Sequence, residues 1–215
     1  MVEIVKKMVM TGLSGLSGLS GAGSPCSSLD WTVIGVDRWP SFRACILSTI
    51  DISGSDSTST FGSLTTAANK WKGGVLAENG AIYGMPRDRI VVLKITPSND
   101  TATTFGSVPS TAAKWFGGVL AHTGNIYGVP HTSTTILKVN PSNDTLSTFG
   151  SIAGSTKWYG AVVAPNGMIY CIPFTATTVL KINPTNDTTT TFGSLSGSSK
   201  WAGGVLAPNG MIYGI

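Results

Sequence analysis

Short runs of apolar and β-branched residues alternate with Gly, Pro, Asn and Asp along most of this chain. In one stretch, residues 158–164 and 168–173 form two such runs on either side of a Pro-Asn-Gly turn. Two more runs, residues 178–183 and 188–193, flank a Pro-Thr-Asn-Asp turn. Runs of this length bounded by turn residues predict strands, and Asn-Gly suits the positive φ of a hairpin. The pattern therefore predicts a unit of four short antiparallel strands.

This unit recurs along the chain with a period of 43 or 44 residues. Its motifs are Lys-Trp-x-Gly, a turn with Gly, Ile-Tyr, Leu-Lys-Ile or Leu-Lys-Val, Asn-Asp-Thr and Thr-Phe-Gly-Ser. The clearest anchors are four tryptophans, spaced 44, 43 and 43 residues apart: Trp71, Trp115, Trp158 and Trp201. A fixed period of this length is typical of repeat architectures.

Both faces of the predicted strands carry apolar residues. In the second unit, Leu137 and Val139 point to one face and Ile136 points to the other, because side chains alternate along a strand. Such strands predict sheets stacked face to face, and four-stranded units of about 40–45 residues that stack radially are the blades of a β-propeller. We therefore predict an all-β fold, a β-propeller of four-stranded antiparallel blades that is either four-bladed or a fragment of a larger propeller.

The expected boundaries leave half a blade at each end. Residues 46–62 match the third and fourth strands of a unit, and residues 201–215 match the first and second. The two halves could complete one blade and close a four-bladed ring, or a fragment could bind another copy through its open edges. The predicted propeller covers residues 31–215, as half-blade 31–62, blades 63–106, 107–150 and 151–193, and half-blade 194–215.

Residues 1–30 are predicted to form a flexible low-complexity leader. Gly-Leu-Ser occurs three times between Gly12 and Ser20, and such a segment buries too little apolar surface to offset its ordering entropy. A secretion signal is the alternative, because Lys6 and Lys7 precede a short apolar patch. The compartment therefore stays open, with a secretory or extracellular location as one alternative. No window approaches the ~20 apolar residues of a membrane span.

Charge and cysteine content exclude several classes of function. Only 11% of residues are charged, the net charge is +4, and no basic run is longer than Lys6-Lys7, so a nucleic-acid partner is not expected. Cys26, Cys45 and Cys171 have no matched spacing. The sequence therefore predicts no metal site, no cofactor and no redox motif.

Two segments carry a resemblance to a known group of propellers. They are Gly-Gly-Val-Leu-Ala-Pro-Asn-Gly-x-Ile-Tyr-Gly-Ile at 203–215 and Val-Leu-Lys-Ile-Asn-Pro-Thr-Asn-Asp-Thr at 179–188. This pattern resembles the blades of YVTN/NHL-type propellers, which include virginiamycin B lyase-like proteins, and the resemblance covers about residues 46–215. A lyase-like site would imply a catalytic His and a magnesium ion held by acidic or amide groups. No matching set is present, so no catalytic residue is carried over.

The titratable residues do not suggest catalysis. The two histidines, His122 and His131, lie in a single repeat and are expected to be exposed turn residues. Repeated Asp residues occupy one turn position, and no pair of carboxylates is set apart for acid–base work. We therefore expect a non-catalytic binding or assembly module, either carbohydrate-binding and lectin-like or a structural subunit of a larger complex. The alternative is a fragment of a lyase- or lactonase-type enzyme whose catalytic blades are missing.

A repeated Lys-Trp pair is the candidate ligand-binding feature. The pairs lie at the junction between consecutive units, so closure would arrange them as a ring at one end of the propeller. Indoles and ammonium groups could then hold sugars or anions. In the structural interpretation, each Trp packs between blades while its Lys stays solvated. The pairs are Lys70-Trp71, Lys114-Trp115, Lys157-Trp158 and Lys200-Trp201.

Three Asn-Asp-Thr sequences are acceptors for N-glycosylation if the chain is secreted in a eukaryote. Their asparagines are Asn99, Asn143 and Asn186, each expected at the tip of an outer hairpin. The alternative is that Pro-x-Asn-Asp serves only as turn chemistry. The expected partners are therefore a protein or carbohydrate ligand, and a second copy bound through open blade edges.

Overall fold

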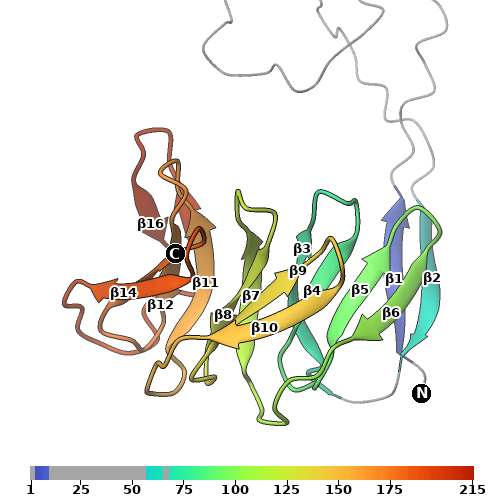
Figure 1. Ribbon diagram of the computed structural model, residues 1–215, viewed down its shortest axis with the longest axis horizontal. Coiled ribbons are helices and arrows are strands. Elements are labelled where there is room, and N and C mark those ends of the chain that lie inside the picture. Colours follow the sequence, from blue (N-terminus) through green and yellow to red (C-terminus); the bar gives the residue numbers. More distant parts are fainter. Residues whose placement is uncertain (1–2, 10–56, 65–67) are drawn as a thin grey trace, which may run out of the picture. The chain divides into compact units, whose positions relative to one another are not determined.

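The computed structural model describes residues 3–9, 57–64 and 68–215 of the chain, and within these ranges it contains strands and turns but no helix. By its contacts the chain divides into two units, residues 1–5 with 61–215, and residues 6–60. Three four-stranded antiparallel sheets, all in the first unit, follow one another along the chain (Figure 1). The all-β propeller-type fold predicted from the repeats is thereby confirmed, and the described ranges contain three complete blades that do not by themselves close a ring.

Each blade is a meander in which consecutive strands pair. The first blade contains β3 (Trp71–Leu76), β4 (Ile82–Pro86), β5 (Val92–Thr96) and β6 (Thr101–Phe105). The second contains β7 (Trp115–Leu120), β8 (Ile126–Pro130), β9 (Ile136–Asn140) and β10 (Thr145–Phe149). The third contains β11 (Trp158–Val163), β12 (Ile169–Pro173), β13 (Val179–Asn183) and β14 (Thr188–Phe192). The strand ends of the third blade agree with the sequence prediction to within one residue.

Turn chemistry explains why the chain reverses where it does. Gly167, between β11 and β12, has a φ of 77°, and Asn166 Oδ1 accepts the Met168 amide at 3.0 Å. Asp144 and Asp187, before the fourth strands, adopt φ values of 53° and 57°. Gly and Asp tolerate this left-handed backbone better than most residues, so the two hairpin types recur wherever the motifs recur.

The first strands of neighbouring blades lie against one another, β3 beside β7 and β7 beside β11. A Cβ atom at Gly73 would lie 2.9 Å from the Gly117 Cα, so only glycine allows this approach. The register of each first strand shifts just after its Trp, for example between Trp71 and Gly74. The variable residue of Lys-Trp-x-Gly therefore lies on a β-bulge at the inner edge of each blade.

The two faces of the second blade bury their residues in two different cores. Leu137 and Val139 pack with the first blade, against Tyr83 and Met85. Ile136 packs with the third blade, in the cluster that contains Leu180. All three side chains of β9 are fully buried. The two-sided apolar pattern of the strand is therefore explained by sheets stacked on both of its faces.

Two further strand pairs lie outside the complete blades. β15 (Gly204–Leu206) pairs with β16 (Ile212–Gly214), as expected for the first two strands of another blade. β1 (Glu3–Val9) pairs with β2 (Ser57–Leu64), and β1 falls within the segment predicted as a leader. The rest of that leader, residues 31–56 of the predicted half-blade, Cys26 and Cys45 lie outside the described residues. No helix in the described ranges is long and apolar enough to cross a membrane.

Candidate functional site

The tryptophans of the Lys-Trp pairs lie between the blades. Trp115 and Trp158 are 1% and 2% exposed, and Trp71 is half-buried. The indole N–H of Trp115 donates to the Thr135 carbonyl at 2.8 Å, and that of Trp158 donates to the Thr178 carbonyl at 2.9 Å. The indoles thus tie each first strand to the loop before the third strand of its own blade, and their faces are covered.

The expectation that the paired lysines stay solvated is wrong. Lys70, Lys114 and Lys157 are all buried. Lys114 Nζ donates to the Thr111 and Arg87 carbonyls at 2.7 and 3.2 Å, and Lys157 Nζ donates to the Gly154 and Ser133 carbonyls at 2.7 and 2.9 Å. Each ammonium group therefore supplies donors to carbonyls of a blade junction. Burial lowers the pKa of Lys157 to about 8 and also lowers the pKa of Lys114.

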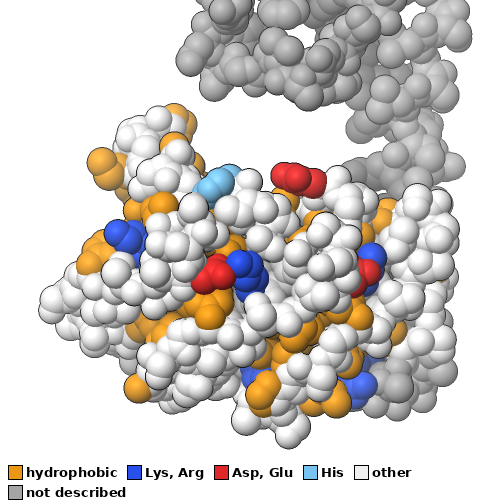
Figure 2. Space-filling model, in the orientation of Figure 1, with side chains coloured by type: hydrophobic (Ala, Val, Ile, Leu, Met, Phe, Trp, Pro, Cys, Tyr) orange, Lys and Arg blue, Asp and Glu red, His pale blue; other side chains and the backbone are white. Residues whose placement is uncertain are grey.

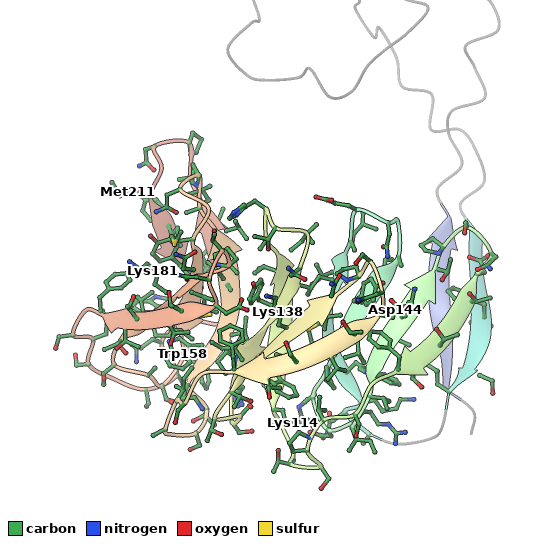
Figure 3. All side chains as sticks on the ribbon, viewed as in Figure 1. Lys114, Lys138, Asp144, Trp158, Lys181 and Met211 are labelled. Carbon is green, nitrogen blue, oxygen red and sulfur yellow. The ribbon has the colours of Figure 1, made fainter. Side chains whose placement is uncertain are left out.

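The ligand-binding role of the pairs stays a prediction. In the second and third pairs both residues are buried, and in the first pair the lysine is buried. The fourth pair, Lys200 and Trp201, is half-buried, and Lys200 Nζ donates to the Gly197 carbonyl at 2.8 Å. In Figure 3, Lys114 and Trp158 lie at the same end of the blades, where strand connections gather. Other residues provide the accessible groups of a candidate site.

Among the positions that differ in all three blades, two are brought together by the structure. One is the bulge residue after each Trp, and the other follows the proline that ends each second strand. We call the six residues the aromatic–cation cluster. Its members are Lys72, Phe116 and Tyr159 from the bulges, and Arg87, His131 and Phe174 from the strand ends.

Side chains from three blades contact one another in this cluster. Lys72 of the first blade donates to the Tyr159 hydroxyl of the third blade at 2.6 Å. Its Nζ also lies 4.6 Å from the ring centre of Phe116 and 4.5 Å from that of Tyr159. Arg87 lies over Phe116 at 5.4 Å. A cation that lies over an aromatic face is attracted electrostatically by the ring. The contacts of Lys72 and Arg87 with the rings therefore stabilise the cluster.

His131 lies at the centre of the cluster, so the expectation that it is an exposed turn residue is wrong. Its ring stacks on Phe116 with centroids 3.8 Å apart and an interplanar angle of 5°. The side chain is buried and its Nδ1 has no hydrogen-bond partner. Burial lowers the pKa of His131, and the nearby charges of Lys157, Lys72 and Arg87 lower it further. His122, by contrast, is exposed as expected.

The cluster offers accessible aromatic surface and positive charge. Tyr159 and Phe174 are half-buried with ring centroids 5.0 Å apart, and Lys72 and Arg87 are also half-buried. The neighbouring carboxylate, Asp88, is already engaged, since it pairs with Arg87 at 2.8 Å and accepts the Ala113 amide at 2.7 Å. Within the described ranges, no three His, Cys, Asp or Glu residues are grouped as metal ligands.

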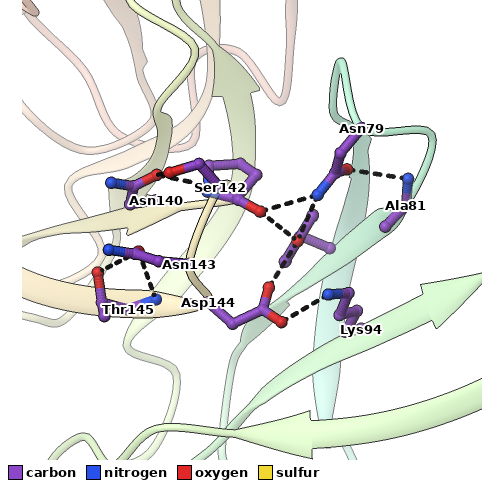
Figure 4. A network of polar contacts seen from close by, with 10 residues as sticks. Asn79, Ala81, Lys94, Asn140, Ser142, Asn143, Asp144 and Thr145 are labelled. Atoms are coloured by element: carbon purple, nitrogen blue, oxygen red, sulfur yellow. Dashed lines mark hydrogen bonds and ion pairs between the residues drawn. The ribbon is translucent and has the colours of Figure 1, made fainter.

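A second repeated feature joins blade to blade, and we call it the aspartate clamp. Tyr83 Oη donates to Asp144 Oδ1 at 2.8 Å, while Lys94 Nζ contacts Asp144 Oδ2 at 2.5 Å (Figure 4). Asn79 completes it by donating to the Tyr83 hydroxyl at 3.1 Å and to the Pro141 carbonyl at 2.8 Å. Tyrosine and lysine of the first blade thus hold the turn of the second.

The same clamp joins the second blade to the third. Tyr127 Oη donates to Asp187 Oδ1 at 2.8 Å, and Lys138 Nζ contacts Asp187 Oδ2 at 2.6 Å. Tyr127 Oη also donates to the Pro184 carbonyl at 3.2 Å. Burial and the Asp187 carboxylate raise the pKa of Tyr127, so the phenol stays protonated and donates. The Asn-Asp-Thr motif therefore has an interface role that turn chemistry alone did not predict.

The acceptor asparagines occupy the tips of the outer hairpins. Asn99, Asn143 and Asn186 are exposed. The Oδ1 atoms of Asn143 and Asn186 accept the hydroxyls of Thr145 and Thr188 at 2.7 and 2.8 Å. Their use as glycosylation sites stays a prediction, because exposed turns are found with and without glycans.

The face of the described residues seen in Figure 2 has no extended charged patch. On the face seen in Figure 2, Lys, Arg, Asp and Glu occur as scattered groups, some of them in opposite-charge pairs. A shallow polar hollow of about 220 Å³ lies on the second blade, lined by Asn125, Lys138, Asn140, Thr145, Leu146 and Ser147. It contains no aromatic side chain, and Lys138 in its lining is engaged by Asp187.

Comparison with known proteins supports the fold and does not identify a function. No protein-family model and no curated protein matches the chain. A streptogramin B lyase is similar with a TM-score of 0.58 and 16% identity, over 69% of this chain and 49% of the lyase. A virginiamycin B lyase from Staphylococcus aureus is similar with a TM-score of 0.60 and 13% identity, over 76% of this chain and 60% of the lyase.

A third similar structure is a candidate 6-phosphogluconolactonase from Bacteroides uniformis, with a TM-score of 0.51 and 16% identity, over 71% of this chain and 50% of the other. At these identities the likeness shows the fold alone. The resemblance to virginiamycin B lyase-like propellers is thus confirmed at the level of the fold. The matched region spans about half to three-fifths of the length of these neighbours.

Proposed function

We propose that this chain is part of a non-catalytic β-propeller module that binds an acidic carbohydrate at the aromatic–cation cluster. One observation carries the proposal. Two of the positions that differ in all three blades converge there, so that each blade contributes different side chains to one place. A site for one asymmetric ligand needs different groups from different blades, and the cluster supplies them.

The chemistry of the cluster suits such a ligand. The half-buried rings of Tyr159 and Phe174 offer apolar faces on which a sugar ring can stack. Lys72 offers positive charge for a carboxylate or sulfate, whereas the charge of Arg87 is already paired with Asp88 at 2.8 Å. Thr175 follows Phe174 directly and adds a hydroxyl, although it is engaged by the Thr156 carbonyl at 2.7 Å. Aromatic faces with a few placed polar groups are typical of small-ligand sites.

A glycan array that includes uronic acid and sulfated saccharides tests the proposal. We expect binding to acidic glycans that falls by at least about tenfold in Tyr159→Ala and in Lys72→Met, since each change removes a direct contact of about 1.4 kcal/mol or more. His122→Ala, an exposed turn residue, serves as the control and should bind like the parent. No binding by the parent, or equal binding by the cluster variants, would exclude this function.

A second candidate is part of a lyase- or lactonase-type enzyme, and His131 favours it. A buried imidazole with an unpartnered Nδ1 lies where three blades meet, and similar structures include a streptogramin B lyase. Against it, the Asp88 carboxylate beside the cluster is already bound by Arg87 and the Ala113 amide. Turnover of a streptogramin B by the parent chain, lost in His131→Ala, would establish this second function in place of the first.

A further inference from the structure

Lys72 and Tyr159 supply two hydrogen-bond donors side by side in the aromatic–cation cluster. Lys72 Nζ donates to Tyr159 Oη at 2.6 Å, so the Tyr159 oxygen acts as an acceptor and its own O–H remains to donate. Within the described ranges no acceptor takes that proton, and no carboxylate pairs with Lys72. An ammonium N–H and a phenol O–H are therefore available to one ligand group.

Two aromatic rings hold the ammonium group in place. Lys72 Nζ lies 4.6 Å from the ring centre of Phe116 and 4.5 Å from that of Tyr159. The two rings are perpendicular, with centroids 4.8 Å apart and 89° between their planes, and His131 stacks on Phe116. Donors that are ordered before a ligand arrives lose little side-chain entropy on binding, so this pair is suited to recognition.

The charges around the cluster favour an anionic ligand group. Lys72, Arg87 and Lys157 all act on His131 as positive charges. Arg87 is paired with Asp88 at 2.8 Å, whereas Lys157 donates to backbone carbonyls. Two of these three cations thus have no carboxylate partner among the residues that the structure describes. A half-buried excess of positive charge attracts an anion.

The number and kind of the donors suit a carboxylate better than a sulfate. A carboxylate has two oxygens in one plane, so one can accept from Lys72 while the other accepts from the Tyr159 hydroxyl. A sulfate ester has a third terminal oxygen. The two phenylalanine rings that contact Tyr159 have no donor for it, and Arg87 is held by Asp88. An oxygen that loses water without gaining a donor weakens binding.

We propose that Tyr159 is the specificity-determining residue of the cluster and that, together with Lys72, it selects a uronic acid through the carboxylate of the sugar. This inference rests on the proposed function and narrows its ligand from acidic carbohydrates to uronates. Tyr159 carries the only hydroxyl among the members of the cluster. The half-buried ring of Phe174, with its centroid 5.0 Å from that of Tyr159, provides the apolar surface for the sugar ring.

Calorimetric titration of the full chain with three matched oligosaccharides, in a galactose and a glucose series, tests this selection. The three are the uronate, its methyl ester, which blocks the carboxylate, and the sulfated neutral sugar. We expect the parent to bind the uronate of one series at least about tenfold more tightly than the ester or the sulfated sugar. Tyr159→Phe keeps the ring and removes the hydroxyl, so it should weaken uronate binding at least about tenfold.

The affinity for the methyl ester separates a specific role of the hydroxyl from a structural one. A displaced ring would weaken the uronate and the ester alike, whereas loss of the carboxylate contact weakens the uronate alone. Tyr170→Phe is the matched control, because it removes a hydroxyl of the same blade that accepts from Asn166 at 3.0 Å outside the cluster. Its uronate affinity should equal that of the parent, and thermal unfolding confirms that both variants are folded.

The titrations distinguish failure of this inference from failure of the proposed function. If the parent binds the sulfated sugar as tightly as the uronate, or Tyr159→Phe binds the uronate like the parent, Tyr159 does not select a carboxylate, although binding of acidic carbohydrates still stands. If the parent binds none of the acidic sugars, or Lys72→Met binds them like the parent, the proposed function is wrong and the selection of uronates is wrong with it.

Discussion

His131 is held in a surrounding that disfavours its charged form. Stacking on Phe116 removes the imidazole from water, and Lys157, Lys72 and Arg87 place positive charge around it. Both effects lower the pKa of His131 below its ordinary value of 6.5. In the folded protein the ring therefore stays neutral at pH values where the unfolded chain is already protonated.

This difference predicts a loss of stability in mild acid. Between the lowered folded pKa and 6.5 the unfolded state binds more protons than the native state, so the free energy of unfolding falls as pH drops below about 6.5. His131→Phe keeps a ring for the stack and removes the titration, so this part of the pH dependence should vanish. Urea unfolding between pH 5 and 8 measures it, with His122→Ala as a control that retains the slope. An unchanged slope in His131→Phe would contradict the assignment.

The buried lysines are explained by backbone carbonyls rather than by acidic partners. Lys114 and Lys157 each donate to one carbonyl of the segment that connects two blades and to one carbonyl of the loop between the second and third strands of the preceding blade. Buried carbonyls need donors, and a long side chain with three N–H bonds can serve two loops at once. The repeat therefore keeps a lysine where an exposed position would tolerate many residues.

At the scale of the element, the approach of neighbouring first strands depends on glycine at the bulges. Gly73 has a φ of 74° and would place a Cβ 2.9 Å from the Gly117 Cα. Gly80 has a similar φ of 78°, but no atom lies within 4 Å of its added Cβ. Both positions therefore share the cost of a positive φ, and only Gly73 has the additional contact between blades.

We expect Gly73→Ala to destabilise the protein more than Gly80→Ala does. Both variants carry the cost of positive φ, about 1–2 kcal/mol, and Gly73→Ala adds an overpacking cost of about 1–3 kcal/mol because β3 must move from β7. Urea denaturation of the two variants gives the difference directly. Equal destabilisation would mean that the strands are not in close contact at this point.

The aspartate clamp predicts unequal effects of the same substitution at repeated tyrosines. Tyr127→Phe removes a buried hydroxyl that donates to Asp187, and we expect a loss of about 1–3 kcal/mol. Tyr213→Phe removes a half-exposed hydroxyl that only accepts from Asn209, and we expect a change within about 0.5 kcal/mol. Thermal and urea unfolding measure both, and similar losses in the two variants would argue against a clamp.

At the scale of the whole molecule, the second strands are less buried from the second blade onward along the chain. All five residues of β8 and four of the five in β12 are buried, whereas β16 has two exposed residues. Each blade is stabilised mainly by its neighbours, so a blade with two neighbours opens less often than one with a free face.

Among the second strands, amide hydrogen exchange should therefore be slowest in β8 and fastest in β16. The expected order follows burial and pairing, because exchange from strands with an open side requires only local opening. Mass spectrometry of peptic fragments resolves these strands. Uniform protection across the blades would show that the unit opens only as a whole.

The repeats allowed the fold to be predicted closely, and the site only in part. Turn residues and alternating runs are local signals, so strands such as β11 and β14 were placed to within one residue. His131 was placed wrongly, because the ring that covers it, Phe116, comes from another strand. The variable positions within near-identical repeats were the available signal for the cluster.

What the sequence by itself determined is the blade: its strands, its turns and the two-sided apolar faces that require neighbours, because these depend on local spacing. Only the tertiary structure decided what the repeated and variable positions do. It buried the lysines of the first three Lys-Trp pairs at the blade junctions, brought Lys72 to Tyr159 across a whole blade, and gave Asp144 and Asp187 their partners on preceding blades. Those contacts join residues 49 to 87 positions apart, and only the stacking of blades sets such distances.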